Sequence, residues 1–330
     1  MQTRTQVLMG TFVNITLPQE YNTQISQSFA TIKTIEDALS SYDENAKVYQ
    51  LNQTHSVTSN SFLKEALEKS IDYYHNTQGY FDITIGSISK DLYHFGEENE
   101  TLPSKEARQK AVRNIDGIMI NEQNITTQAN IVLDLGGVGK GYAVDKVSTL
   151  LQEQNITQGI IALSGDIRCL HACVFELQSP YSQQTFARLN ALTPNLSIST
   201  SGTYRRYVKT QEHHHLINPK TASQGKAFVS VSLFTHASNA TIDAYATAIS
   251  VMPKDIAFDF LKKHHEIGFV LVESDGTIRY GNVSGLVSIK WLDYNERATT
   301  ANNIKKSATN TPMAKSLIHP DTTTPKEMKP

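Results

Sequence analysis

The chain has 330 residues, of which 39% are hydrophobic, and a formal net charge of −2. This composition indicates a globular protein long enough for one large domain or two ordinary ones, and it excludes collagen, a coiled coil and a fully disordered chain. Thirty Lys and Arg against 32 Asp and Glu give no electrostatic reason to expect nucleic acid as a partner. No stretch of the sequence approaches the roughly 18 consecutive apolar residues of a transmembrane helix.

The start of the chain and its two cysteines bear on the cellular compartment. The N-terminus lacks the basic start and apolar run of a signal peptide, so we expect a cytoplasmic protein. Cys169 and Cys173 are too few for a disulfide framework, and their spacing fits neither a Cys-x-x-Cys redox pattern nor a complete zinc site. We therefore expect two packing thiols.

The first part of the chain predicts a strand followed by two amphipathic helices. Apolar residues predict the strand over residues 6–17. Helical spacing predicts one helix up to Leu39 and a second that ends at Gln78-Gly79, where glycine is the expected left-handed cap. The apolar faces are Ile25, Phe29, Ile32 and Leu39 in the first helix, and Leu63, Ala66, Leu67, Ile71 and Tyr74 in the second.

The remainder mixes strands and helices without a regular βαβ repeat, which favours an α+β fold. A short apolar strand over 131–135 leads through a glycine turn into a helix, and a hairpin turns at Asp275-Gly276. Further elements are predicted as strands over 159–163, 196–200 and 228–234 and as a buried helix over 242–249.

After Asn295 the composition changes to Thr, Asn, Lys, Ala and Pro. Such a segment buries too little apolar surface to offset the entropy lost on ordering. We predict one domain over residues 1–295 and a disordered tail over 296–330.

A glycine-rich segment, residues 134–145, joins the strand predicted over 131–135 to the next helix. Its glycines let backbone amides approach an anion and Lys140 adds a positive charge, so one interpretation is a phosphate-bearing ligand. It is neither a Walker A loop nor a Rossmann fingerprint, because Gly141 replaces the magnesium-binding hydroxyl and Tyr142 replaces the third glycine. A tight turn with a solvated lysine explains the segment equally well.

Asp243 and Thr247 lie four residues apart in a predicted helix, so their oxygens share one face. Hard oxygen ligands at this spacing suit Mg²⁺ or Ca²⁺, which would neutralise a nearby pyrophosphate. Taken alone, the two residues favour a simpler interpretation. The Thr bonds back to a carbonyl, and the Asp in the first turn is stabilised by the helix dipole.

Three consecutive histidines, His213, His214 and His215, precede a turn. Such a run is usually solvated, because neighbours in an extended chain point to opposite faces and do not converge on one metal. One buried histidine near neutral pKa would serve as a general base. Upstream, residues 199–206 combine hydroxyls, a glycine turn and two arginines, which suits contacts to phosphate or ribose; exposed arginines at a strand end are the alternative.

Tyr80, Phe81 and Asp82 stand at a glycine-bounded strand start within residues 78–86. Aromatic faces can stack on a flavin or adenine, although core packing is their commoner use.

Together and in this order, these segments resemble the ApbE family, the FAD:protein FMN transferases. The resemblance covers roughly residues 6–292 and rests on the segments 9–11, 41–42, 79–86, 134–145, 164–168, 200–205 and 215–219, and on Asp243 and Thr247. It implies an α+β, T-fold-related architecture with a flavin cleft between two lobes. It also implies Mg²⁺-dependent transfer of the FMN moiety of FAD to a Thr or Ser hydroxyl of a target flavoprotein, with release of AMP.

The resemblance assigns roles to individual residues. His215 is the predicted general base, and Asp243 is the second candidate for a catalytic role. The positions that hold FAD in the family are Met9, Tyr42, Tyr80, Phe81, Asp82, Asp134, Lys140 and Ile217 here. The positions that hold the metal are Gly137, by its carbonyl, Asp243 and Thr247.

Four positions depart from the family's pattern. Ser164 replaces the first glycine of a Gly-Gly-Asp, and Asn218 replaces the Asp before Pro219. Thr203 stands where an acid or Ser is common, and Ala246 stands where some relatives carry an acid one residue before the metal threonine. Two other functions stay open, a Mg²⁺-dependent FAD pyrophosphatase that gives free FMN and AMP, and a non-enzymatic flavin-binding protein. Many relatives are periplasmic lipoproteins, so a periplasmic or inner-membrane-associated location is the alternative to the cytoplasm.

Overall fold

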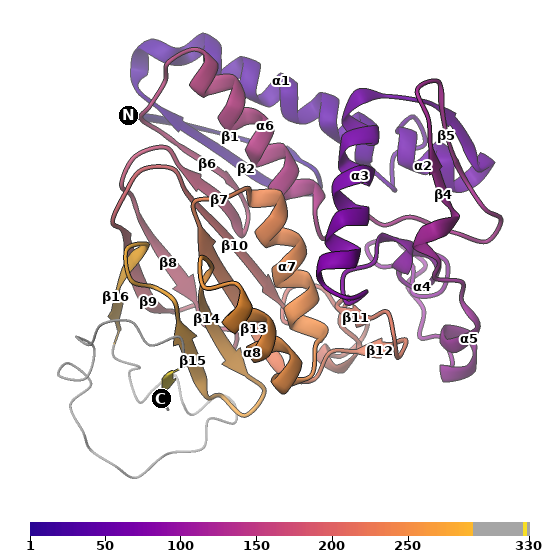
Figure 1. Ribbon diagram of the computed structural model, residues 1–330. Helices are drawn as coiled ribbons and strands as arrows, with labels where there is room; N and C mark the ends of the chain where they lie inside the picture. The colour runs from indigo at the N-terminus through magenta and orange to yellow at the C-terminus, as the bar shows by residue number, and fades with distance from the viewer. Residues whose placement is uncertain (293–325, 329–330) are drawn as a thin grey trace.

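A long antiparallel sheet forms the centre of the molecule (Figure 1). The structure is a computed structural model that describes residues 1–292 and the backbone of residues 326–328. Within these residues the sheet has nine strands in the order β1-β2-β6-β7-β10-β13-β14-β15-β17. Its strands are β1 (Gln2–Leu8), β2 (Thr11–Leu17), β6 (Ile160–Leu163), β7 (Asp166–Cys169), β10 (Leu196–Gly202), β13 (Phe228–Thr235), β14 (Gly268–Glu273), β15 (Ile278–Gly281) and β17 (Lys326–Met328).

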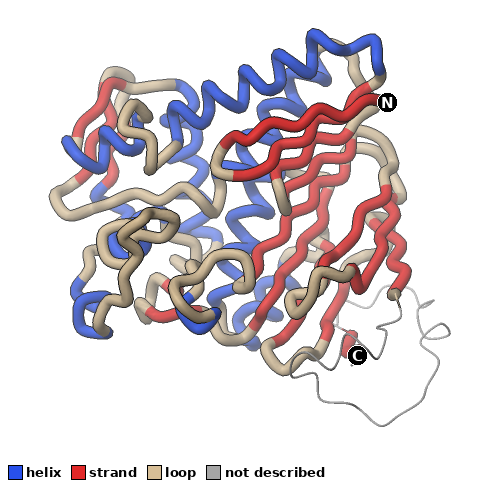
Figure 2. Tube along the Cα trace, turned by 180° about the vertical axis from the view of Figure 1, so that it is seen from behind, coloured by secondary structure: helices blue, strands red, loops and turns tan. Residues whose placement is uncertain are grey.

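Both faces of this sheet are buried at β14, whereas the edge strand β1 is largely exposed. Alternate side chains of a strand point to opposite faces, so Phe269 and Leu271 enter one hydrophobic core while Val270 and Val272 enter another. The first core lies under helices α1 (Asn22–Leu39), α6 (Gly139–Glu153), α7 (Asn239–Val251) and α8 (Lys254–Lys263). The second lies against a small sheet of β8 (Val174–Gln178), β9 (Thr185–Ala191) and β16 (Val287–Trp291), and Figure 2 shows the strands from the side opposite the helices.

A smaller lobe packs beside the sheet (Figure 1). It contains α2 (Lys47–Thr54), α3 (Ser61–Asn76), α4 (Gly86–Ser89), α5 (Lys105–Lys110) and a sheet of β3 (Ser56–Thr58), β5 (Asn124–Thr127) and β4 (Ile118–Ile120). Helix α3 joins the lobes, because the ring of Tyr73 makes edge contacts at 5.9 Å with Tyr245 of α7 and at 6.1 Å with Phe81. The remaining elements are 3₁₀ turns at Gln19–Tyr21, Ile83–Ile85, Ile115–Gly117 and Gln211–His213, and a short ribbon of β11 (Ile217–Asn218) and β12 (Ser223–Gln224).

The α+β class is confirmed, and so are the two N-terminal helices, the buried helix α7 and the hairpin of β14 and β15. The strand predicted over residues 6–17 is wrong in detail, because it is two paired strands with a turn at Met9-Gly10. Both turn residues have positive φ, 51° and 67°, which folds the chain back on itself.

No strand forms over residues 131–135 or 78–86, where the sequence predicts them. The backbone of the first segment is bonded by side chains instead of a neighbouring strand: Leu133 N–H donates to Asn52 at 2.8 Å, and Val132 N–H donates to Ser87 at 3.3 Å. The second segment contains a 3₁₀ turn and α4. Local side-chain hydrogen bonds therefore replace the expected ladder.

The two cysteines are not free thiols. A disulfide joins Cys169 and Cys173, whose Cα atoms lie 5.9 Å apart, a separation that suits such a bond. The expectation of packing thiols is corrected, because the bend after β7 turns the second cysteine back toward the first within the same buried cluster.

Most of the tail predicted to be disordered, residues 296–330, lies outside the described residues. Within it, the backbone of β17 pairs antiparallel with β15. The edge of β15 presents backbone groups to which a further strand can add. In the described part of the chain, no helix is long and apolar enough to cross a membrane.

Candidate active site

A buried cluster of three charged side chains lies where α6 meets α7 and β7. The ammonium group of Lys140 lies 2.9 Å from Asp166 Oδ2 and 3.4 Å from Asp243 Oδ2. Both carboxylates are almost completely buried. Burial and repulsion by Asp166 raise the pKa of Asp243 to about 7, and the two carboxylates raise the pKa of Lys140 although burial alone would lower it. We call Lys140, Asp166 and Asp243 the charge cluster.

The contact between α6 and α7 positions the charge cluster. Gly141 N–H of α6 donates to Asp243 Oδ2 at 3.0 Å. A side chain at Gly141 is impossible without movement, because its Cβ would lie 2.5 Å from the carbonyl oxygen of Asn239. The glycine in the helix therefore allows the close approach that brings Lys140 to Asp243.

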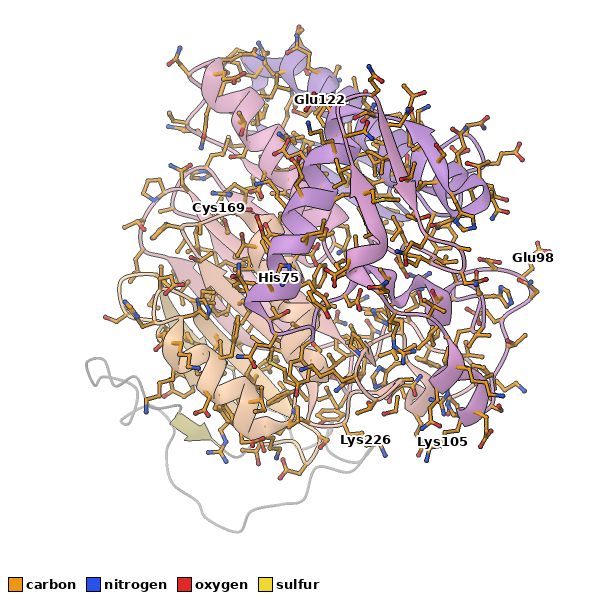
Figure 3. The ribbon with its side chains drawn as sticks, turned by 45° about the vertical axis from the view of Figure 1, so that its right-hand side comes forward. His75, Glu98, Lys105, Glu122, Cys169 and Lys226 are labelled. Carbon is orange, nitrogen blue, oxygen red and sulfur yellow. A yellow bond between two sulfur atoms is a disulfide. The ribbon has the colours of Figure 1, made fainter. Side chains whose placement is uncertain are left out.

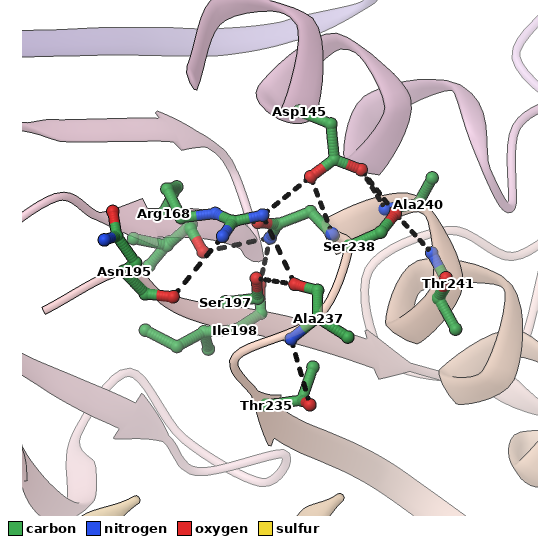
Figure 4. Close-up of polar contacts among 12 residues, drawn as sticks. Asp145, Arg168, Asn195, Ser197, Ile198, Thr235, Ala237, Ser238, Ala240 and Thr241 are labelled. Carbon is green, nitrogen blue, oxygen red and sulfur yellow. Dashed lines mark hydrogen bonds and ion pairs between the residues drawn. The ribbon is translucent and has the colours of Figure 1, made fainter. Parts of the chain in front are cut away.

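A second network holds the start of α7 in place (Figure 4). Asp145 of α6 accepts hydrogen bonds from the N–H groups of Asn239 and Ala240 at 2.8 and 2.9 Å and from the hydroxyl of Ser238 at 2.6 Å. It also pairs with Arg168 of β7 at 2.8 Å. A carboxylate at a helix N-terminus satisfies its free amides and complements its dipole. Asp145 therefore ties α7, α6 and β7 into one rigid support.

The three residues predicted to hold a metal are brought together. Asp243 and Thr247 lie one turn apart on α7. A Cβ built on Gly137 would lie 2.9 Å from Thr247 Oγ1, so this glycine packs directly on the threonine. Within the described residues, no group of three or more His, Cys, Asp or Glu side chains is placed to hold a metal. The predicted set is of another kind, with one carboxylate, one hydroxyl and one carbonyl.

A second group of polar residues surrounds Asp134 at the start of the glycine-rich loop. Its carboxylate accepts hydrogen bonds from Gly136 N–H at 2.9 Å and from the Ser89 hydroxyl at 2.7 Å. Burial opposes ionisation, but the charge of Lys90 and these two bonds lower the pKa of Asp134. The residue therefore carries a negative charge in the folded protein.

Lys90 belongs to the group around Asp134, although no pattern in the sequence indicates it. Its side chain is 6% exposed, and its ammonium group lies 3.2 Å from the centre of the Tyr42 ring. Among the described residues, Lys90 Nζ has no hydrogen-bond partner, and burial lowers its pKa. Position 90 follows a short helix in an apolar segment, and nothing in its spacing signals a functional lysine.

Tyr42 and His215 contact different parts of the same residue, Arg206. The Tyr42 hydroxyl donates to the carbonyl oxygen of Phe95 at 2.9 Å, and the guanidinium of Arg206 contacts both this hydroxyl and the same carbonyl. The ring of His215 lies with Nδ1 3.1 Å from the carbonyl oxygen of Arg206. Because a carbonyl only accepts, Nδ1 carries the proton and Nε2 keeps a free lone pair. Burial, followed by the charge of Arg206, lowers the pKa of His215 to about 4.

The other two histidines have different surroundings. His214 is buried, and its Nε2 lies 3.0 Å from the carbonyl oxygen of Gly225, so the expectation of a solvated run is wrong for this residue. His213 is half-buried at the end of a 3₁₀ turn. The alternation predicted for neighbouring residues separates His214 from His215, as their different carbonyl partners show.

The remaining predicted flavin residues divide into accessible and buried side chains. Tyr80 is half-buried, with the ammonium of Lys220 4.3 Å from its ring centre. Phe81 and Ile217 are buried in hydrophobic clusters. Asp82 is 8% exposed and bonds Thr84 N–H and Oγ1 at 2.8 and 2.6 Å; burial raises its pKa.

Met9 lies close to the helix that carries Lys140. The end of its side chain is 3.4 Å from the Cβ position of Gly139. The loop from Asp134 to Lys140 thus borders both groups of polar residues, and the side chains of Met9, Phe81 and Thr247 lie against its glycines.

The departures Ser164 and Asn218 have structural explanations. Ser164 has φ 56°, the left-handed conformation that a glycine adopts without strain. Asn218 Oδ1 accepts the Lys220 N–H at 2.8 Å, and its amide donates to the Val251 carbonyl at 2.9 Å. An aspartate could make the first bond but not the second, so Asn218 links the turn to α7.

The family model described as the ApbE family matches residues 9–271. This chain belongs to the ApbE family. Among curated relatives, a FAD:protein FMN transferase of Klebsiella pneumoniae is 26% identical over 65% of this chain and 71% of its own length. One of Treponema pallidum is 22% identical over 84% of this chain and 85% of its own.

Solved structures share the fold of this ApbE chain. The crystal structure of the ApbE protein from Thermotoga maritima superposes with a TM-score of 0.75 at 22% identity, over 84% of this chain and 96% of that one. The flavin transferase ApbE from Vibrio cholerae superposes with a TM-score of 0.69 at 20% identity, over 88% of this chain and 96% of that one. The resemblance that the sequence motifs indicate is thereby confirmed, and so is the mixed α and β architecture.

Proposed function

We propose that this protein transfers the FMN moiety of FAD to a Thr or Ser hydroxyl of a target flavoprotein and releases AMP. The names of its relatives support a flavin transferase, and the chain covers most of their length. The observation that carries the proposal is the charge cluster, in which one lysine and two buried carboxylates meet beside a glycine loop and a threonine hydroxyl.

We propose that Mg²⁺ binds to the Gly137 carbonyl, Asp243 and Thr247. Oxygen donors of these types are those that Mg²⁺ prefers. Asp243 lies close to a second buried carboxylate, which opposes its ionisation, and a divalent cation would stabilise the ionised form. When bound, the metal supplies positive charge to the oxygens of the pyrophosphate.

The chain's own residues would then bind the phosphates, orient FAD and accept the proton of the acceptor hydroxyl. Lys140, fixed by Asp166, would direct a positive charge at the phosphates, and the loop after Asp134 would orient the dinucleotide beside Tyr42. The acceptor hydroxyl attacks the phosphorus of the FMN half, its proton passes to Nε2 of His215, and the bond to the AMP half breaks. An imidazole with a pKa near 4 is neutral at physiological pH and free to accept that proton.

The decisive experiment incubates the protein with FAD, MgCl₂ and a flavoprotein domain that contains a flavinylation Thr, and measures the mass of the domain. A gain equal to the FMN moiety, together with AMP in the supernatant, is the expected result. A Thr→Ala acceptor is the control. Free FMN without a mass gain would instead assign a pyrophosphatase, and unchanged FAD would assign a flavin-binding protein.

A further inference from the structure

A basic pocket lies between α5 and the turn that joins β11 to β12. Its volume is about 590 Å³, within the range of small-molecule sites. It shares no residue with the charge cluster. The lining residues that matter here are Lys105, Arg108, Arg113, Lys220, Thr221 and Ser223.

The cations of this pocket interact with neutral groups. Arg108 donates to the Ala222 carbonyl at 3.2 Å and to Gln224 Oε1 at 3.4 Å. Arg113 donates to two carbonyl oxygens, both at 3.0 Å. Lys220 faces the Tyr80 ring. In the part of the chain that the structure describes, none of the four cations forms a direct ion pair with a carboxylate. Glu106 lies near enough to Lys105 and Arg108, and Asp82 near enough to Arg113, to interact with them electrostatically, so the positive charge of the pocket is offset only in part.

Four cations around one pocket repel each other, and an anion between them would relieve that repulsion. Near the same opening, the hydroxyls of Thr221 and Ser223 are hydrogen-bonded to each other at 2.8 Å, which leaves one hydroxyl proton free to donate to a ligand. Guanidinium groups match the oxygens of a phosphate with paired hydrogen bonds. Lys105 is exposed on α5 at the outer surface of the smaller lobe (Figure 3), so a ligand reaches the pocket from solvent.

We propose that this pocket binds the phosphate group of a small molecule, at a site separate from the one that holds the pyrophosphate of FAD. The shared chemistry is a phosphate dianion, whose source is either inorganic phosphate or a nucleoside monophosphate. The binding requires no flavin transfer, so it can be tested independently of the proposed enzymatic function.

The test is isothermal titration calorimetry of the full chain in EDTA, which removes divalent metal, with AMP, inorganic phosphate and adenosine as separate probes. We expect AMP and phosphate to bind and adenosine not to bind. Tighter binding of AMP than of phosphate would identify a nucleotide site, and equal binding a site for the phosphate group alone. AMP should still bind at saturating FAD, although Lys220 of the pocket lies beside Tyr80, a predicted FAD residue.

Variants locate the binding. Lys105→Gln combined with Arg113→Gln should weaken AMP binding about tenfold or more, the loss expected for two charge-assisted hydrogen bonds. Lys110→Gln is the matched control, an exposed lysine on the same helix that does not line the pocket, and should change affinity less than about twofold. Because Arg113 also bonds the backbone, Lys105→Glu alone is tested in parallel; its side chain is exposed, and it should give at least a threefold loss by charge reversal.

Four results would overturn the proposal. They are no heat of binding with either AMP or phosphate, equal binding of adenosine, complete displacement of AMP by FAD, and unchanged affinity in both the double variant and Lys105→Glu. The melting temperature of each variant, followed by circular dichroism, separates a lost ligand contact from a lost fold.

Discussion

The ammonium group of Lys90 lies 3.2 Å from the centre of the Tyr42 ring, with both residues at the site that the family resemblance assigns to flavin. A desolvated cation over an aromatic face gains about 2 kcal/mol, yet Nζ still lacks a hydrogen-bond acceptor among the described residues. A bound ligand can supply that acceptor. The pair therefore places a buried positive charge, which no pattern in the sequence indicates, at the predicted flavin site.

Replacing Lys90 tests this relationship. Lys90→Met keeps most of the side-chain volume but removes the cation beside Tyr42 and the charge that stabilises the Asp134 carboxylate, so the free energy of unfolding should fall by about 1–3 kcal/mol. FAD binding should weaken about tenfold, because one charge-assisted hydrogen bond is lost. Calorimetry with FAD measures this effect, and Lys262→Met, at an exposed position of α8, is the control. Unchanged FAD affinity would leave Lys90 with a purely structural role.

Asp243→Asn separates metal binding from folding. The amide keeps the size of the carboxyl group but removes its charge, so Mg²⁺-dependent transfer should fall to background. The melting temperature should stay equal or rise, because repulsion with Asp166 disappears while the 2.9 Å pair of Lys140 and Asp166 remains. FAD binding in EDTA should change less than about threefold, since stacking and loop contacts are untouched. An active Asp243→Asn enzyme would place the metal elsewhere.

The three histidines should differ in their effect on rate. His215→Ala should lower the transfer rate by about 10²- to 10⁴-fold at saturating FAD and Mg²⁺, the usual contribution of a general base. His213→Ala and His214→Ala should retain most of the rate, because neither ring shares the Arg206 contact of His215. Single-turnover measurements from pH 6 to 8 should show no acid limb for the wild type, since His215 is already neutral there. A near-normal rate in His215→Ala would make Asp243 the better candidate base.

The same histidine should make stability depend on pH. Its pKa is about 4 in the folded chain against 6.5 for an ordinary histidine, so between these values the unfolded chain binds more protons. The stabilisation is complete above pH 6.5 and is lost as the pH falls toward 4. Urea unfolding at pH 7 and pH 4.5 should show a smaller acid loss for His215→Asn than for the wild type. An equal loss in both proteins would contradict the burial of the neutral ring.

The Asp145 network should be the most costly to break. Asp145→Asn leaves Arg168, only 7% exposed, without its charge partner, and about 3 kcal/mol of unfolding free energy should be lost. Glu176→Gln removes the partner of Arg188 in an exposed pair and should cost less than about 1 kcal/mol. Urea denaturation of both variants gives the comparison. Similar losses of unfolding free energy in the two variants would show that the Asp145 network stabilises the protein no more than an exposed ion pair does.

The features that depend on nearby residues could be predicted from the sequence. Apolar spacing located α1 and α3, because each buries one face, and the apolar content of α7 located that helix, which is buried on nearly all sides. Long-range partners could not be predicted. The bond between Asp145 and Asn239 spans 94 positions, and the segment at 131–135 gives up its strand because Asn52, 81 positions before Leu133, bonds its backbone. Asp145 lies in a motif segment, but its partner Asn239 and the supporting Asn52 lie outside every motif segment.

The disulfide between Cys169 and Cys173 closes a loop with a sequence separation of only 4. Chain-entropy arguments give a loop this short about 2 kcal/mol of stabilisation, against the ~5–15 kcal/mol that holds a typical folded protein together. A compartment that keeps thiols reduced would remove no more than that. Both sulfurs would stay inside the same hydrophobic cluster, where cysteine packs as a small apolar residue. We therefore expect the fold to tolerate reduction of this bond.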